Sequence, residues 1–226
     1  MRPSAAARSP TFASVIMPVH VCRAHLTHLW TKVRDRETSP VEFRRYARRL
    51  MRVIGEEGLS FVNAEAVDVT TPVGEHVFKG TTNNLSSVVI VSIIRAGDSL
   101  LDVMMELVPE CAVGKILIQR DEETAEPKLF YSKLPPSIEN KSIILVDPML
   151  ATGGSAIVAI RILLEHGVKQ KDITFLNVVS CPEGIAKIQE IYPDITLVTG
   201  AIDAGLNEQK YIVPGLGDYG DRYFST

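Results

Sequence analysis

One strand–turn–helix segment constrains the fold of this chain more than any other part of it. The apolar run Ser142–Val146 is typical of a buried strand, and residues 155–164 have the composition of a buried helix. The turn between them contains Asp147-Pro148 and Thr152-Gly153-Gly154. Glycines let a ligand approach the backbone, and a helix N-terminus offers free N–H groups and a dipole that favours negative charge. The segment therefore predicts an anion site.

The side chains of this turn indicate which kinds of anion site are possible. Thr152 and Ser155 add hydroxyl donors, and Asp147 stands at the carboxyl end of the strand, where open α/β sheets bind their ligands. The turn is not a nucleotide P-loop, because no Lys followed by Ser or Thr comes after the glycines. An ordinary turn between a strand and a helix is the structural alternative.

Strand and helix patterns alternate from residue 87 onward. Strands separated by helices of about 10–15 residues imply a parallel sheet, so we expect an α/β fold. Residues 121–134 are charged and irregular apart from a strand-like stretch at Lys128–Tyr131, and residues 200–226 have no regular period. The predicted strands are 87–94, 113–119, 143–147, 173–179 and 195–199, and the predicted helices are 98–107, 154–166 and 182–192.

The earlier part of the chain predicts an extension to this sheet. Residues 39–58 have a helical pattern in which Ser39 is the N-cap and Glu42 completes a capping box. Phe61–Asp68 and Glu75–Phe78 predict a hairpin outside the main sheet.

Residues 19–36 predict a further helix, which carries His20, His25 and His28 around Cys22. A metal site is one interpretation. The spacing matches no common zinc pattern, so partly exposed histidines are the favoured interpretation.

Composition excludes several classes of protein. With 226 residues, 46% of them hydrophobic, the chain suits one α/β domain, which we place at residues 19–226 with 200–226 as its tail. A formal net charge of −3 argues against a nucleic-acid-binding protein. The three cysteines have no CxxC pairing, which favours free thiols and a cytoplasmic protein. No apolar run approaches the roughly 20 residues of a membrane helix.

The first 34 residues contain arginines but no Asp or Glu, which is partly typical of a transit peptide. Pro3 and Pro10 interrupt an amphipathic helix there. We therefore expect residues 1–18 to be a disordered extension, with organellar targeting by residues 1–34 as the alternative.

The turn reads Asp147-Pro-Met-Leu-Ala-Thr-Gly-Gly-Ser155 and closely resembles the 5-phosphoribosyl diphosphate (PRPP) motif of type I phosphoribosyltransferases. Most relatives of other specificity carry a second acid in place of Pro148, and this version is similar to that of uracil phosphoribosyltransferases. The resemblance implies that Asp147 binds the ribose hydroxyls and that Ala151–Ser155 bind the 5′-phosphate. The implied contacts are Asp147, Pro148, Met149, Leu150, Ala151, Thr152, Gly153, Gly154 and Ser155.

Two further segments carry the resemblance. Residues 94–97, Ile-Arg-Ala-Gly, are similar to the family's Leu-Arg-Ala-Gly loop, which implies that Arg95 contacts the diphosphate through charge-assisted bonds. Residues 120–127 are similar to a family segment that implies Arg120 as a second PRPP contact, followed by a flap that closes over the substrate. Asp98 departs from the family's small or apolar residue, and an N-cap is its structural interpretation.

The tail reads Tyr-Ile-Val-Pro-Gly-Leu-Gly-Asp-Tyr-Gly-Asp over residues 211–221 and resembles the family's uracil-binding tail. The resemblance implies that Ile212 and residues 217–219 read the base through backbone groups, with Asp218 near the metal. The spacing Gly215-x-Gly217-x-x-Gly220 is not a dinucleotide fingerprint, because too few residues follow for a βαβ unit.

Tyr219 departs from the family's usual Ala, and Ser225 from its usual Gly. If the backbone alone contacts uracil, the Tyr219 side chain can point outward. If it points inward, it would shrink the pocket and prevent uracil from binding.

The resemblance covers residues 60–226 and implies a parallel sheet flanked by helices, as in type I phosphoribosyltransferases. It implies transfer of 5-phosphoribosyl from PRPP to N1 of uracil in pyrimidine salvage, with Mg²⁺ bound through PRPP. A regulatory protein that binds PRPP or a nucleotide without catalysis is the second hypothesis, motivated by Tyr219 and Asp98. The implied catalytic residues are Arg95, Arg120, Asp147 and Asp218.

Five arginines load the predicted helix 39–58 with positive charge, at positions 44, 45, 48, 49 and 52. A solvated face or a subunit contact is one interpretation. A site for GTP, which activates some members of the family, is the other. The hairpin and the N-terminal helices suit a homodimer or a higher homo-oligomer.

Overall fold

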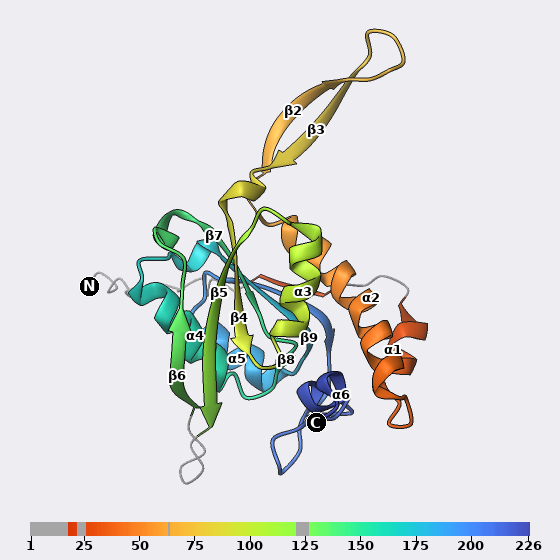
Figure 1. The fold of residues 1–226 in the computed structure, drawn as a ribbon, viewed down its shortest axis with the longest axis vertical. Coiled ribbons are helices and arrows are strands. Elements are labelled where there is room, and N and C mark those ends of the chain that lie inside the picture. Colours follow the sequence, from red (N-terminus) through yellow and green to blue (C-terminus); the bar gives the residue numbers. More distant parts are fainter. Residues whose placement is uncertain (1–17, 22–25, 63, 121–126) are drawn as a thin grey trace, which may run out of the picture.

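The computed structural model describes residues 18–21, 26–62, 64–120 and 127–226. Its centre is an eight-stranded sheet with the order β1-β10-β9-β7-β4-β5-β6, and β8 pairs with β9 (Figure 1). All neighbouring strands run parallel except β5 and β6, which confirms the predicted sheet. The strands are β1 Val19–Val21, β4 Val88–Ile94, β5 Ala112–Arg120, β6 Pro127–Lys133, β7 Ser142–Val146, β8 Met149–Leu150, β9 Ile173–Ser180 and β10 Thr196–Ile202.

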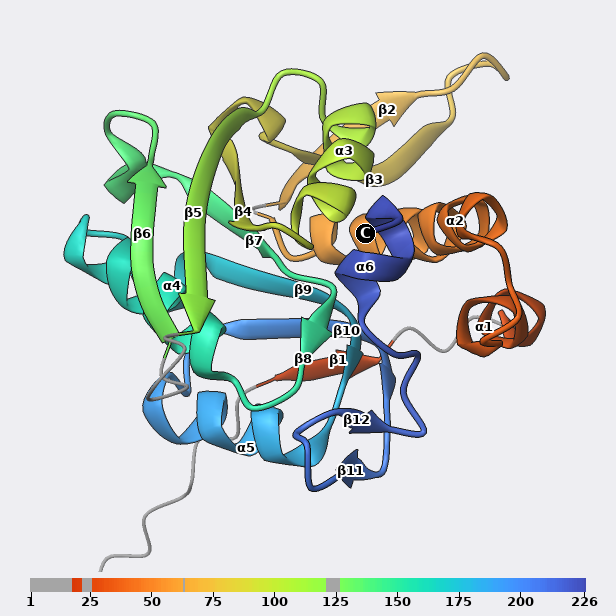
Figure 2. The ribbon, with the colours of Figure 1, turned by 60° about the horizontal axis from the view of Figure 1, so that its bottom comes forward.

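Helices cover both faces of this sheet (Figure 2). α1, α2 and α3 pack over one cluster of buried side chains, and α4 and α5 pack over another. Strand β7 contributes to both, since Ile144 and Val146 belong to the first cluster and Ile143 and Leu145 to the second. The helices are α1 Thr27–Arg34, α2 Pro40–Leu59, α3 Asp98–Leu107, α4 Gly154–Glu165 and α5 Pro182–Ile191, with 3₁₀ turns at Leu85–Ser87, Ile138–Asn140 and Gln170–Asp172.

The order of the strands reverses between β4 and β7. From β4 the chain continues outward to β5 and β6 on one side, and from β7 it continues outward to β9 and β10 on the other. β4 and β7 pair in parallel, with Ser92 opposite Val146, so their carboxyl ends lie side by side. Open α/β sheets bind ligands in the crevice at such a reversal. Arg95 follows β4 and Asp147 follows β7, so both predicted residues stand at this point.

The predicted hairpin exists as a separate two-stranded sheet, β2 Ala64–Thr70 with β3 Val77–Asn83, and it projects from the body of the protein (Figure 1). The predicted N-cap of α2 is confirmed, whereas the Glu42 side chain contacts the Ser39 hydroxyl, at 3.4 Å, instead of completing the capping box. The Oγ atom of Ser39 accepts the N–H of Glu42 at 3.4 Å, and Ser39 is the N-cap.

The predicted helix at residues 19–36 is wrong in its first part. Val19–Val21 form strand β1 on the edge of β10, and the helix begins only at Thr27. Two β-branched residues beside a free sheet edge favour a strand, which a helical period cannot reveal. Cys22 and His25 lie outside the described residues. His20 packs on Phe61, with ring centroids 4.2 Å apart, and the described residues contain no group of three or more metal-binding side chains.

The tail has more structure than its sequence predicts. It forms a short antiparallel pair, β11 Gly205–Leu206 with β12 Ile212–Val213, and ends in helix α6 Tyr219–Phe224. The predicted extension at 1–18 and the predicted flap lie almost entirely outside the described residues. Across the described segments, no helix is long and apolar enough to cross a membrane.

Candidate active site

The predicted anion turn forms a small recess at the N-terminus of α4. The recess has a volume of about 70 Å³ and is lined by Asp147 and residues 149–156. Gly153 precedes the helix with a φ of 76°, a conformation that favours glycine. Pro148 does not line the recess. It is buried, and its carbonyl oxygen accepts the N–H groups of Val178 and Val179.

Two residues that the sequence did not single out support this turn from below. Asn177 on β9 is fully buried, and its side-chain amide donates to the carbonyl oxygen of Asp147 at 2.7 Å. Gly184 on α5 lies so close that a Cβ atom there would be 2.4 Å from the carbonyl oxygen of Ala151. Neither residue belongs to a recognisable motif, because each acts through packing against a segment distant in the sequence.

Asp147 is the most perturbed carboxyl group of the site. Asp147 is half-buried where the two recesses meet, and desolvation of its carboxylate raises its pKa to about 7. The N–H of Met149, 3.3 Å from Oδ1, acts in the opposite direction. A carboxyl group with this pKa changes charge near neutral pH, so it can accept hydroxyl groups as an anion once positive charge is near.

The tail forms a larger pocket directly beside this recess. The pocket has a volume of about 440 Å³ and contains every predicted base-reading residue together with Asp147. Three residues that the sequence analysis did not assign also line it, in the turn before β12. The lining residues are Ala96, Asp147, Met149, Ala151, Gln209, Lys210, Tyr211, Ile212, Gly217, Asp218, Tyr219 and Gly220.

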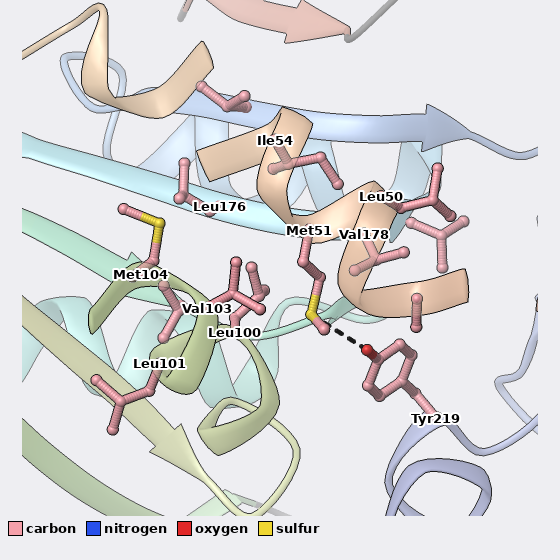
Figure 3. Close-up of a cluster of buried hydrophobic side chains, with 14 of the residues drawn as sticks. Leu50, Met51, Ile54, Leu100, Leu101, Val103, Met104, Leu176, Val178 and Tyr219 are labelled. Carbon is pink, nitrogen blue, oxygen red and sulfur yellow. Dashed lines mark hydrogen bonds between the residues drawn. The ribbon is translucent and has the colours of Figure 1, made fainter. Parts of the chain in front are cut away.

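The side chain of Tyr219 takes neither of the two predicted directions. It is 1% exposed and points into the core beneath α2 and α3 (Figure 3). Its hydroxyl donates to the sulfur of Met51 at 3.3 Å, and its ring meets Phe43 edge-on at 5.3 Å. Burial raises the pKa of Tyr219. The ring therefore does not fill the base pocket, and the departure from Ala does not block it.

A third recess, of about 420 Å³, lies at the predicted diphosphate loop. It is lined by residues 94–96, residues 117–119, Asp218 and Gly220. Gly97, at the end of this loop, serves packing. A Cβ atom there would be 2.5 Å from the carbonyl oxygen of Val146, so this glycine lets the loop pack against β7.

The predicted N-cap role of Asp98 is wrong. Gly97 occupies the cap position, and Asp98 is the first residue of α3. The carboxylate of Asp98 accepts Ser92 Oγ at 2.7 Å and Lys115 Nζ at 2.9 Å. Its charge is therefore paired, and it does not face the diphosphate recess as an isolated anion.

Arg120 ends β5, and its backbone pairs with Pro127 where the chain returns as β6. Pro127 lies against the anion turn, because its Cγ atom is 3.3 Å from the position of a Cβ on Gly154. The side chain of Arg120 and the flap at 121–126 lie outside the described structure.

The three recesses form one continuous groove along the carboxyl ends of β4 and β7. The anion recess and the base pocket share Asp147, Met149 and Ala151. The base pocket and the diphosphate recess share Ala96, Asp218 and Gly220.

The loop that forms the base pocket is fixed by two arginines that the sequence analysis did not assign to the site. Arg34 on α1 binds Asp203 through two hydrogen bonds, of 2.7 and 2.6 Å, and donates to the carbonyl oxygen of Gly215 at 2.8 Å. Asp203 also accepts the N–H of Gly215. Arg222 donates to the carbonyl oxygen of Leu216 at 2.7 Å. The only sequence signal for Arg34 was its place among N-terminal arginines.

Comparisons with known proteins identify the family of this chain. A family model described as uracil phosphoribosyltransferase matches residues 21–226. The chain belongs to the uracil phosphoribosyltransferase family. It is 48% identical over 201 residues to the uracil phosphoribosyltransferase of Dictyostelium discoideum, covering 89% of this chain and 92% of that one. It is 46% identical over 199 residues to the uracil phosphoribosyltransferase of Saccharomyces cerevisiae, covering 88% and 91%.

A solved structure shares the fold. The AQ2163 protein of Aquifex aeolicus superposes with a TM-score of 0.79 at 34% identity, covering 93% of this chain and 99% of that one. The family match also extends beyond the predicted resemblance, because it begins at residue 21 and so includes α1 and α2. These are the helices that hold the tail through Arg34, Phe43 and Met51.

Replacing Tyr219 by Ala should destabilise the protein rather than open a pocket. Loss of a buried aromatic ring costs about 3–5 kcal/mol of unfolding free energy. Tyr219→Phe keeps the ring and should cost only about 1 kcal/mol. Tyr131→Ala, a change on the exposed face of β6, is the matched control and should cost less than about 1 kcal/mol. Urea unfolding measures all three, and a Tyr219→Ala protein of unchanged stability would contradict the buried placement.

Asp147 should make the stability of the ligand-free protein depend on pH. Because its pKa is raised in the folded state, wild-type protein loses stability as pH rises from about 4 to about 7, and Asp147→Asn does not. One pKa unit corresponds to about 1.4 kcal/mol, and water in the groove reduces the effect. Between these two pH values we therefore expect the unfolding free energy of Asp147→Asn to rise by about 2 kcal/mol relative to that of wild type. Unfolding measured at both pH values tests this. Parallel pH profiles would refute it.

Proposed function

We propose that this chain transfers the 5-phosphoribosyl group of PRPP to N1 of uracil, giving UMP and pyrophosphate, in pyrimidine salvage. The observation that carries the proposal is the continuous groove, which joins an anion recess, a pocket formed by the tail and a recess beside Arg95 in a member of this family. The three recesses offer one place each for the 5′-phosphate, the base and the diphosphate. The activity makes the chain a pentosyltransferase.

Each recess has a proposed ligand. The 5′-phosphate binds in the turn at Ala151–Ser155, where N–H groups at the start of α4 and the hydroxyls of Thr152 and Ser155 donate. Asp147 binds the ribose hydroxyls between the phosphate recess and the base pocket. Arg95 and Arg120 bind the diphosphate. Uracil binds the backbone of Ile212 and of residues 217–219.

The chemistry needs stabilisation of a leaving group more than a strong base. The bond from ribose C1 to the diphosphate oxygen breaks while a bond from C1 to uracil N1 forms, and uracil loses its N1 proton. The guanidinium groups of Arg95 and Arg120 neutralise charge that develops on the departing pyrophosphate. Uracil N1–H is acidic, so the groove needs no strong general base. Positioning of both substrates supplies much of the remaining acceleration.

The described residues fit a Mg²⁺ ion that binds through the substrate. Asp147 and Asp218 both line the base pocket, and no larger cluster of ligands exists among the described residues. Mg²⁺ commonly takes one or two carboxylates and fills its other positions with substrate oxygens and water. Bound in this way it would neutralise charge on the diphosphate.

The two residues that suggested the regulatory alternative do not support it in the structure. Tyr219 is buried in the core, and Asp98 is paired with Lys115. Four of the five arginines of this helix have partners within the protein. Arg48 and Arg52 bind Glu106, Arg44 donates to the carbonyl oxygen of Tyr223, and Arg49 lies 3.4 Å from Nε2 of His28. A GTP effector, a homodimer or higher homo-oligomer and a cytoplasmic location stay predictions.

Incubation with labelled uracil, PRPP and Mg²⁺ tests the proposed function directly. We expect labelled UMP and pyrophosphate in equal amounts. Another pyrimidine or purine base in place of uracil serves as the specificity control. Binding of PRPP without formation of UMP would refute the transferase and support the regulatory alternative.

Thr152→Val should weaken PRPP binding without changing the shape of the turn. The variant removes a hydroxyl donor to the phosphate, and we expect a loss of about 1–3 kcal/mol in binding free energy. Thr196→Val, at the far end of β10, is the matched control. Titration of both variants with PRPP gives the affinities. Unchanged affinity in Thr152→Val would exclude the phosphate role of this hydroxyl.

A further inference from the structure

The guanidinium group of Arg95 is already held by the end of the tail. Its Nη2 atom donates to Oδ1 of Asp221 at 2.5 Å, and its Nη1 atom donates to Oγ1 of Thr226 at 2.9 Å. Thr226 Oγ1 in turn donates to the same oxygen of Asp221 at 3.1 Å. Arg95 also lies over the ring of Phe224, 6.0 Å from its centre. Three side chains from the last six residues therefore meet the distant Arg95 at the diphosphate recess.

This network continues into the base pocket through α6. Asp218 lines both recesses, and its carboxylate accepts the N–H of Asp221 at 2.9 Å as the N-cap of α6. Gly220 lets the Arg95 side chain pass, because a Cβ atom there would be 3.0 Å from Nη2. The base-reading loop and Arg95 are thus joined by contacts that span only four residues of the tail, 218–221.

We propose that Asp221 is a positioning residue, which orients Arg95 toward the diphosphate. The proposal rests on the proposed function, since it takes Arg95 as the diphosphate contact. No sequence motif assigned a role to Asp221.

Asp221 can orient Arg95 without competing for it. A guanidinium group has five N–H donors, and Asp221 and Thr226 use two of them. The other three, including that on Nε, have no partner among the residues that the structure describes. Arg95 is about half exposed, with 48% of its side chain accessible, so without Asp221 it would sample many rotamers and lose entropy on binding.

The ion pair between Arg95 and Asp221 is too exposed to stabilise the fold appreciably, so Asp221 can be substituted without unfolding the protein. The two side chains are 48% and 51% accessible, and such pairs contribute little to stability. A change in substrate binding by an Asp221 variant therefore reports on orientation and not on unfolding.

Steady-state kinetics of Asp221→Asn test the proposal. We expect KM for PRPP to rise about 10-fold while KM for uracil changes less than about 2-fold. Asp221→Glu should recover part of the loss, because it keeps the charge. Asp68→Asn, which removes an equally simple ion pair with Lys79 on the hairpin, is the matched control and should change neither constant.

A double-mutant cycle separates this proposal from the assignment of Arg95. In the Arg95→Met background, Asp221→Asn should have no further effect on KM for PRPP. If Arg95→Met raises KM for PRPP but Asp221→Asn does not, the positioning role is wrong and the proposed function stands. If Asp221→Asn lowers KM for PRPP, the carboxylate competes with the substrate and the proposal is overturned. An unchanged KM in Arg95→Met would refute the diphosphate role of Arg95 itself.

Discussion

Burial of the Tyr219 ring beneath α2 and α3 fixes the position of the loop that forms the base pocket. The ring is 1% exposed, and Tyr219 is one of the residues that line this pocket. A peptide segment anchored on one side by a buried aromatic residue can present its N–H and C=O groups in one arrangement on the other side. Arg34 and Arg222 hold the same loop through the carbonyl oxygens of Gly215 and Leu216. Packing and hydrogen bonds therefore hold the base-reading loop in one conformation, which an isolated tail would not keep.

This anchoring gives the N-terminal helices a part in the site. α2 lies on the sheet beside β9 and β10, and it supplies Phe43 and Met51 to the cavity that receives Tyr219. α1 supplies Arg34, whose two bonds to the buried carboxylate of Asp203 fix the start of the loop. The sheet positions Arg95 and Asp147, and the helices at the beginning of the chain position the segment at its end. Both ends of the chain are needed to complete one groove.

The sequence predicts those features that depend on local signals. The buried runs at 142–146 and 173–179, and the Ser39 cap of α2, lie in short segments, and the structure confirms them. Features that depend on distant partners were predicted poorly or missed. Val19–Val21 became a strand because the edge of β10 was free, and Asp98 faces Ser92 and Lys115 instead of capping its helix. The direction of Tyr219 depends on a cavity formed by residues more than one hundred positions earlier. The candidate site could therefore be named from motifs, but its supports could not.

The charged side chains that line the groove nearly cancel one another. Among the described residues that line it, the carboxylates of Asp147 and Asp218 face the cations of Arg95 and Lys210, which leaves little net positive charge for a substrate with three phosphate groups. Backbone N–H groups at the start of α4 compensate in part, since they attract anions without carrying a full charge. The raised pKa of Asp147 prevents a permanent anion at the centre of the empty groove. A divalent cation close to Asp147 would lower this pKa and favour the ionised carboxylate. Under the proposed function, the groove would therefore suit a substrate–metal complex better than the free polyanion.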